Sequence, residues 1–178
     1  AIFCAGDDST RSIIGFTGGT DTLSINNYLG GSYVTDKTTS AVFRDPSAWY
    51  HIVISSDGAT SFNVYVNGVV QTFSSSTGPT SADWAFNSTF AHAIGNKTFT
   101  VGSAKYFDGY MADINFIDGQ ALDPSYFGKF NATTGVWQPI FYTGTYGTNG
   151  FHLTFANNAS TTTLGYDSSG NSNNWTTN

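Results

Sequence analysis

Stretches in which apolar and polar residues alternate recur along the whole chain, and clusters of Gly, Asn, Asp and Ser separate them. Alternation with a period of two places successive side chains on opposite faces of a β-strand. Asn67-Gly68 lies between two apolar pairs, and because both residues tolerate a positive φ, it predicts a hairpin with a type I′ turn. The alternating stretches are residues 11–17, 22–28, 47–56, 62–73, 90–95, 110–117 and 151–156.

The composition limits helical content. The sequence contains no Glu, and Leu, Lys and Arg are scarce, so many of the residues that fill helix surfaces are missing. One short helical turn is expected near 123–128, because Asp123 can cap it, Pro124 suits its first position and Gly128 can end it. Many short strands separated by turns predict an all-β fold, an antiparallel β-sandwich or jelly roll.

The 178 residues fit one main domain with a sizeable core, since 39% of them are hydrophobic. We expect the sandwich over residues 1–156 and a polar C-terminal segment over 157–178, which forms a closing strand or leads into a further domain. Residues 74–88 show no sustained period and predict a surface loop. Trp49 stands near the start of a stretch that is apolar on both faces, so we expect it to be buried.

Charged residues make up only 10% of the chain, and the formal net charge is −6. The six basic residues are scattered singly, so no basic face is expected that could bind the phosphates of nucleic acid. No apolar run approaches the roughly 18 residues of a membrane helix, so no membrane insertion is expected. Cys4 has no partner for an internal disulfide and is expected as a small apolar side chain in a strand.

Three carboxylates, Asp108, Asp113 and Asp118, stand five residues apart around one expected strand. Glycoside hydrolysis normally needs two carboxyl groups that flank the scissile bond. Only Asp113 could contribute from the face of that strand, and the chain has no Glu to supply a second group. Asp108 and Asp118 each precede a Gly, which is typical of turns. We therefore expect structural roles for all three and no catalytic residue.

Other catalytic and metal motifs are missing. His51, His92 and His152 each lie in an alternating stretch, without the spacing of a zinc site and without a G-x-S-x-G motif. We expect them in or near the core. The glycines of residues 144–150 are not followed by a helical pattern, so they predict a loop with positive φ angles and no phosphate site.

Calcium is the metal whose oxygen ligands the chain could supply. The weak candidates are Asp7, Asp8 and Asp167, which lie in GDDST and DSSGNSNN. Neither cluster has the ligand spacing of an EF-hand, so no cofactor is the expectation and a solvated turn is the simpler interpretation of both.

Sugar binding would need aromatic faces beside polar groups on an exposed rim. The best-placed candidates are Trp84 in the loop 74–88 and Trp137, Tyr142 and Tyr146 in the late loops 136–149. The alternative for each is burial under loops or at a contact with another subunit.

Three segments in chain order resemble the laminin-G-like branch of the concanavalin A-like sandwiches: AWYHIVISSDG, VYVNGVV and YFDGYMADINFIDGQALDPSYFG. The resemblance implies a β-sandwich, and relatives of this kind often hold calcium at loop rims. The matching residues are Trp49, His51, Asn67, Gly68, Phe107, Gly109, Asp113, Ala121 and Leu122.

Nearly the whole chain also resembles virion structural proteins of marine tailed phages, which carry such sandwiches in fibres, spikes or capsid decorations. This resemblance implies a place on the virion surface, contacts with other virion subunits, and a homo-oligomer, expected as a trimer. It also implies a further strand before IFCAG, so we expect the first strand or strands of the sandwich to lie outside this sequence. The segments that carry it are VFRDPSAWYHIV, YFDGYMADINFIDGQAL, GVWQPIFYTGTYGTNGFHLTF and DSSGNSNNWT.

The fold alone leaves the function open, because such sandwiches host lectins, adhesion modules, hydrolases and lyases. The first hypothesis is a non-catalytic structural and adhesive module on a phage particle that contacts host-surface glycans. The second is a polysaccharide lyase or hydrolase, in which Tyr and His would replace paired carboxylates. The third is a structural cement without a ligand.

Overall fold

The computed structural model describes residues 1–58, 61–78, 84–100 and 106–177. Contacts between Cα atoms divide the chain into two compact units. The first, which we call the sandwich unit, comprises Ala1–Asp108 and Leu122–Phe141. The second unit comprises Gly109–Ala121 and Tyr142–Asn178. The expected boundary between residues 156 and 157 stays a prediction.

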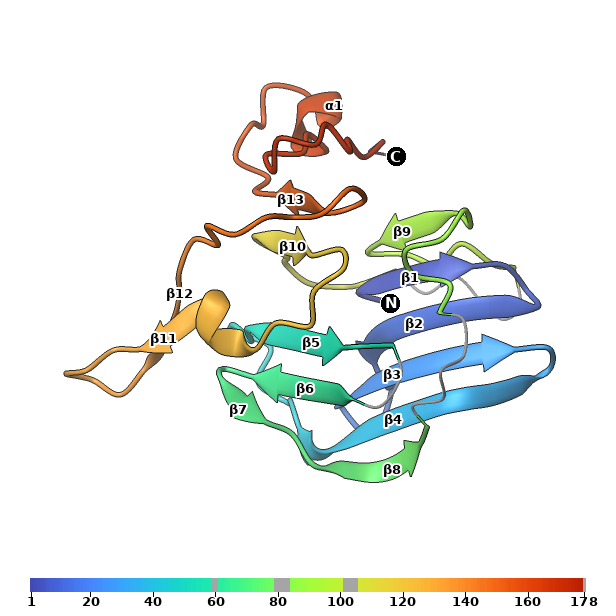
Figure 1. Cartoon of the computed structure of the whole chain (residues 1–178). Helices are drawn as coiled ribbons and strands as arrows, with labels where there is room; N and C mark the ends of the chain where they lie inside the picture. Colours follow the sequence, from blue (N-terminus) through green and yellow to red (C-terminus); the bar gives the residue numbers. More distant parts are fainter. Residues whose placement is uncertain (59–60, 79–83, 101–105, 178) are drawn as a thin grey trace. The chain divides into compact units, whose positions relative to one another are not determined.

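The described part of the sandwich unit contains two main antiparallel sheets (Figure 1). The larger sheet has the strand order β8-β4-β3-β2-β1-β9. Its strands are β1 (Phe3–Gly6), β2 (Thr10–Phe16), β3 (Thr22–Leu29), β4 (Ser32–Val42), β8 (Phe73–Thr77) and β9 (His92–Ile94). The smaller sheet has the order β5-β6-β7, with β5 (Ile52–Ser56), β6 (Phe62–Val66) and β7 (Val69–Val70).

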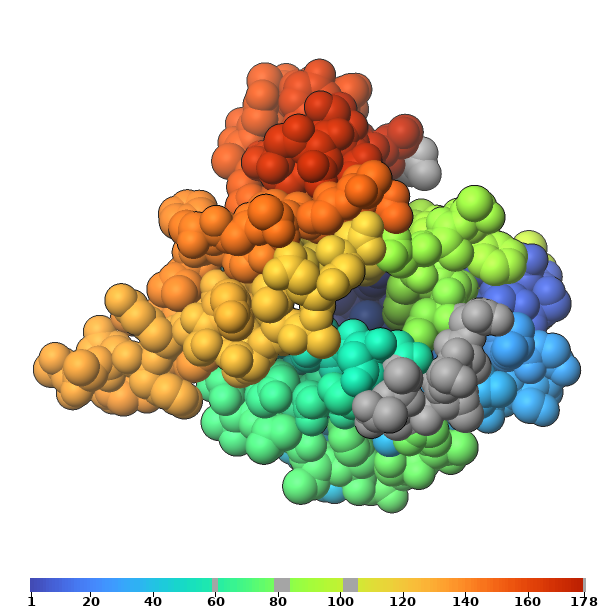
Figure 2. Space-filling model, in the orientation of Figure 1, coloured from blue at the N-terminus to red at the C-terminus, as the bar shows by residue number. Residues whose placement is uncertain are grey.

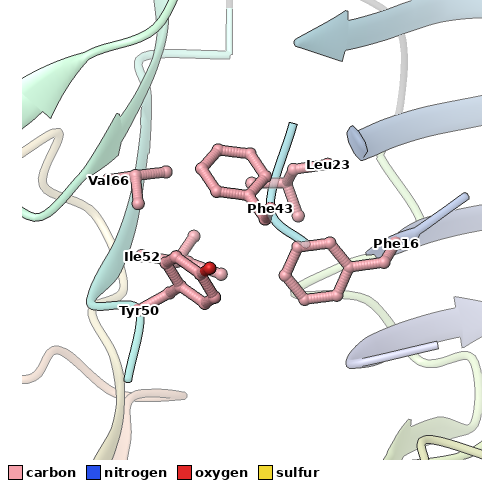
Figure 3. Close-up of a pocket in the computed structure, with 6 residues that line it drawn as sticks. All are labelled: Phe16, Leu23, Phe43, Tyr50, Ile52 and Val66. Carbon is pink, nitrogen blue, oxygen red and sulfur yellow. The ribbon is translucent and has the colours of Figure 1, made fainter. Parts of the chain in front are cut away.

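The hydrophobic core joins these two sheets. Leu23 and Ile25 of β3 and Val64 and Val66 of β6 form a buried cluster. At one end of it, side chains from both sheets point toward one another and leave no room for a water molecule (Figure 3). They are Phe16, Leu23, Phe43, Tyr50, Ile52 and Val66. The period-two alternation thus supplies one apolar face to each sheet, and the prediction of an all-β sandwich is confirmed.

The predicted hairpin joins β6 to β7. Asn67 and Gly68 have φ angles of 50° and 76°, so both adopt the positive φ that a type I′ turn requires. The Asn67 side chain adds a further contact, because its Oδ1 accepts a hydrogen bond from the backbone N–H of His51 at 2.8 Å. Cys4 is fully buried in β1, as expected, and the three histidines are buried or half-buried.

The prediction that Trp49 is buried is wrong. The strand begins at Ile52, and Trp49 is 65% exposed. The cause lies upstream, where Asp45 Oδ1 accepts hydrogen bonds from the backbone N–H and the hydroxyl of Ser47, at 2.9 and 2.6 Å. This local turn competes with the extended conformation and delays the strand.

The predicted loop 74–88 contains most of a strand, β8, which pairs with β4 at the edge of the larger sheet. The side chains of Ser74–Thr77 are exposed, so the strand carries no alternating apolar signal. Lys37 of β4 holds it, because its Nζ donates to Ser76 Oγ and to the carbonyl of Gly78, both at 2.6 Å. Residues 79–83 of the predicted loop lie outside the described residues.

The helical turn is found as a 3-10 helix, η1 (Pro124–Tyr126), and Asp123 Oδ1 caps it by accepting from Ser125 N–H at 2.8 Å. The prediction that Gly128 ends this helix is wrong, because Phe127 is its C-cap residue and Gly128 is the first residue of a strand. The strand, β11 (Gly128–Phe130), pairs with β12 (Trp137–Pro139). This hairpin, light orange in Figure 2, projects from the sandwich unit.

The second unit contains β10 (Ile114–Phe116), paired with β13 (Phe151–Leu153), and a short helix α1 (Thr161–Leu164). Both strands are shorter than predicted, because Asp113 and Phe155 adopt a φ of 55° and break the extended backbone. The helix α1 was not predicted, because it is rich in β-branched Thr; a capping box formed by Ser160 and Thr163 stabilises it. Among the described residues, no helix has the length and apolar character to cross a membrane.

Candidate functional site

The second unit contains an open depression of about 490 Å³, a volume in the range of small-ligand sites. Its lining is neutral and polar, with hydroxyl groups, one amide side chain and glycine backbone. The lining residues are Gly144, Thr145, Tyr146, Gly147, Thr148, Ser169 and Asn171. The site therefore combines the loop that precedes β13 with the loop that follows α1.

Asp167 organises the C-terminal loop. Its Oδ1 accepts hydrogen bonds from the backbone N–H groups of His152 and Ser169, both at 2.8 Å. Its Oδ2 accepts from the Ser169 hydroxyl at 2.8 Å and from the Asn173 N–H at 2.9 Å. Burial acts to raise the pKa of this carboxyl, but the hydrogen bonds outweigh it and hold the pKa below the usual 3.8.

Two asparagine side chains tie the two loops together. Asn171 Nδ2 donates to the carbonyls of Gly147 and Gly150, at 2.6 and 2.9 Å. Asn173 Nδ2 donates to the carbonyls of Thr148 and Gly150, at 3.0 and 2.9 Å. These bonds satisfy backbone acceptors that a loop cannot pair with itself, so the C-terminal loop fixes the shape of the depression.

The glycines of the loop are needed for close backbone approaches. Gly147 has a φ of 74°, and a Cβ there would lie 2.3 Å from the carbonyl oxygen of Asp118. A Cβ on Gly150 would lie 1.9 Å from the carbonyl oxygen of Tyr146. The expectation of a loop with positive φ is confirmed at Gly147.

The two predicted tyrosines meet in this unit. The rings of Tyr142 and Tyr146 lie 5.1 Å apart at 90°, and the Tyr142 hydroxyl donates to the carbonyl of Thr145 at 3.0 Å. Tyr146 lines the depression, but its side chain is only 9% exposed and its hydroxyl donates to Asn115 Oδ1 at 2.7 Å. Burial, followed by the negative charge of Asp113, raises the pKa of Tyr146 to about 12.

Asp113 and His152 form a pair that the sequence did not reveal. Asp113 Oδ1 lies 2.5 Å from His152 Nε2, and the His152 ring stacks on Tyr146 with centroids 5.9 Å apart. His152 is 8% exposed. The two residues are 39 positions apart, and the β10–β13 pairing together with the positive φ of Asp113 brings them into contact. The expectation that His152 lies in or near the core is confirmed, and the contact with Asp113 is a feature that no local motif predicts.

The two predicted tryptophans belong to the sandwich unit. Trp84 is half-buried and packs on the core cluster, with the nearly parallel rings of Phe62 and Phe86 at centroid distances of 5.5 and 6.0 Å. Trp137 is also half-buried, and its Nε1 donates to His51 Nδ1 at 3.0 Å. Both rings therefore serve packing within that unit, and a role in glycan binding stays a prediction for each.

The three weak calcium candidates accept hydrogen bonds from within the protein, locally at Asp7 and over a long sequence distance at Asp8. Asp7 Oδ1 accepts from the N–H and the hydroxyl of Ser9 and from the N–H of Thr10, each at 2.8 Å. Asp8 accepts from the N–H and the hydroxyl of Thr100, and Asp167 accepts the four bonds described above. In the part of the chain that the structure describes, no three His, Cys, Asp or Glu side chains come together as metal ligands. Whether calcium binds at Asp7, Asp8 or Asp167 stays a prediction.

The chain is similar to one known protein family. A laminin-G family model, described as the concanavalin A-like lectin/glucanases superfamily, matches residues 1–125. Neither a curated protein nor a solved structure matches the chain. The matched residues make up well over half of the sequence and include all strands of the two main sheets. The chain therefore belongs to the concanavalin A-like lectin/glucanases superfamily.

Proposed function

We propose that this chain is a non-catalytic carbohydrate-binding module, displayed on the surface of a virion, and that it binds glycans in the depression of the second unit. Membership of a superfamily named for lectins and glucanases supports the ligand class. The observation that carries the proposal is the open depression, whose hydroxyl, amide and glycine-backbone lining suits the hydroxyl groups of a sugar.

The shape of the depression is set before a ligand arrives. Asn171 and Asn173 hold the carbonyls of the loop 144–150, and Asp167 holds Ser169. A preformed site spends less binding free energy on ordering its loops, which matters for a small and shallow contact. Tyr146 is part of the same lining, and its hydroxyl is held by Asn115 Oδ1.

The groups around the depression support a role without catalysis. A hydrolase normally uses two carboxyl groups about 5–5.5 Å or 6.5–9.5 Å apart, one of them protonated. Asp167 is saturated by hydrogen bonds that favour its charged form, and Asp113 is paired with His152. Tyr146, with a pKa near 12, is a weak acid at neutral pH, so it is poorly suited to act as a base.

The virion location and the oligomeric form rest on the resemblance of four segments to structural proteins of marine tailed phages. A trimer or a larger array would present several depressions to one cell surface, and this multivalency would convert weak contacts into firm adhesion. Labelling of purified particles with an antibody against this chain tests the location. Particles without label would contradict it.

A glycan array tests the binding site. We expect the chain to bind a subset of immobilised glycans, and Thr148→Met to weaken binding by at least about tenfold, because it fills the depression and removes a hydroxyl. Thr162→Met is the matched control, since Thr162 is exposed in the same unit and does not line the depression. Equal binding by all three proteins would place the glycan elsewhere.

One observation favours the alternative, a polysaccharide lyase or hydrolase. Asp113 is hydrogen-bonded to His152, whose ring stacks on the lining residue Tyr146, and such a set could move a proton. Incubation with polysaccharides, followed by assay of reducing and unsaturated ends, separates the two functions. Our proposal predicts no product; product that disappears in His152→Gln would establish the enzyme and overturn the proposal.

A further inference from the structure

We infer that the depression of the second unit selects uncharged saccharides and rejects anionic ones such as sulfated, phosphorylated or uronic-acid glycans. This inference rests on the proposed function and adds the chemical class of the ligand. It comes from the distribution of charge along the chain, which differs sharply between the two units.

The second unit contains no Lys and no Arg. All six basic residues of the chain fall in residues 1–108 and 122–141, and none falls in 109–121 or 142–178. The charged side chains of the second unit are Asp113, Asp118 and Asp167, while its single histidine, His152, is paired with Asp113. An anionic ligand would therefore find no cation there to offset the loss of its hydration.

Two of these carboxylates touch the lining. Asp167 Oδ2 accepts the hydroxyl hydrogen of Ser169, one of the lining residues. Asp118 Oδ2 accepts from the N–H of Asn149 at 3.1 Å, and the carbonyl of Asp118 lies against Gly147. An anion in the depression would approach these negative charges without a compensating partner, so the local field favours neutral ligands.

The hydrogen-bonding groups of the lining match hydroxyls. The N–H groups of Gly144, Thr145, Gly147 and Thr148 make no hydrogen bond within the described residues, and they can donate to a ligand. Both amide hydrogens of Asn171 are used by loop carbonyls, which leaves its Oδ1 as an acceptor. A sugar hydroxyl both donates and accepts, whereas an anionic group only accepts.

Free N–H groups on a glycine-rich loop can also hold an anion, so the experiment must separate the two cases. The chain is titrated against immobilised dextran, mannan and galactan and against the sulfated derivative of each. Each titration is repeated between about 0.05 and 0.5 M salt, since a charge-driven contact weakens as the Debye length shrinks.

We expect binding to at least one neutral polymer, weaker binding to its sulfated derivative, and affinities for the neutral form that change less than about twofold with salt. Thr148→Lys is expected to gain salt-sensitive binding to the sulfated polymer, while Thr162→Lys, outside the lining, leaves the preference unchanged. A wild-type chain that prefers the sulfated polymers through Thr148 and its neighbours would overturn the inference and keep the proposed function. Binding to none of the six polymers and to no glycan on the array would contradict both the inference and the proposed function.

Discussion

The indole ring of Trp137 fits where it does because Gly68 and Gly128 have no side chains. A Cβ on Gly68 would lie 2.3 Å from the Trp137 ring, and a Cβ on Gly128 would lie 2.4 Å from it. The indole thus lies against two glycine backbones and donates to His51. Because Gly128 has no positive φ, its requirement for glycine is purely steric, whereas Gly68 also needs its φ of 76°.

The contact between Gly128 and Trp137 predicts that adding a single methyl group at Gly128 destabilises the protein. Gly128→Ala is expected to lower the free energy of unfolding by about 1–3 kcal/mol, because the added Cβ collides with a ring that also lies against Gly68 and donates to His51. Thermal and urea unfolding measure the loss. Gly18→Ala is the control, since no atom lies within 4 Å of a Cβ there and its φ is not positive. Equal stability of the two variants would contradict the account of Trp137.

Only some residues of the depression could be predicted from the sequence. Tyr142 and Tyr146 stood out because aromatic residues in a glycine-rich loop are conspicuous. Thr148, Ser169 and Asn171 did not, because small polar residues are common in every loop of this chain. They become a site through hydrogen bonds between residues more than 20 positions apart, such as Asn171 to Gly147, and no local pattern encodes such a pairing.

Among the elements, the β6–β7 hairpin was predicted from a local turn signal, whereas the polar strand β8 depends on a partner strand and was not predicted. The β6–β7 hairpin follows from Asn67-Gly68, whose turn chemistry acts over four residues. The polar strand β8 exists because β4 offers an open edge and Lys37 reaches across to Ser76. The strand at residues 110–117 shortens because Asp113 leaves the extended conformation, a choice that propensity alone does not reveal.

The loop held by Asp167 gives a pH-dependent prediction. Its folded pKa lies below the usual 3.8, so the carboxylate stabilises the fold above pH 3.8, and this stabilisation is lost as the pH falls further, through the folded pKa. At pH 6 we expect Asp167→Asn to lower the free energy of unfolding by about 2 kcal/mol, because four hydrogen bonds to a charged acceptor are weakened.

Urea unfolding of both proteins at several pH values measures the effect. The difference between wild type and Asp167→Asn is expected to shrink below pH 3.8, as the wild-type carboxylate is protonated. Asp108→Asn serves as control, because Asp108 is exposed and its carboxylate makes no hydrogen bond or ion pair within the described residues. A difference that stays constant from pH 6 to the acid limit would show that Asp167 does not act through its charge.

At the scale of the whole molecule, the main core and the proposed binding site lie in different units. The sandwich unit holds the main core and every basic residue, and nearly all of the family match falls within it. The second unit holds the depression, and its loops 142–150 and 167–174 lie beyond residue 125, where the family match ends. The superfamily therefore accounts for the sandwich, while the proposed site is a feature of the remaining chain.

Hydrogen exchange with and without a glycan that the chain binds, read by mass spectrometry, tests the central claim most directly. The free N–H groups of Gly144, Thr145, Gly147 and Thr148 should exchange quickly in the unliganded chain and slowly in the complex. We predict that protection appears in peptides covering 142–150 and 167–174 and leaves the sandwich unit unchanged. Protection confined to the sandwich unit, with 142–150 unaffected, would contradict the account and move the glycan site to the family fold itself.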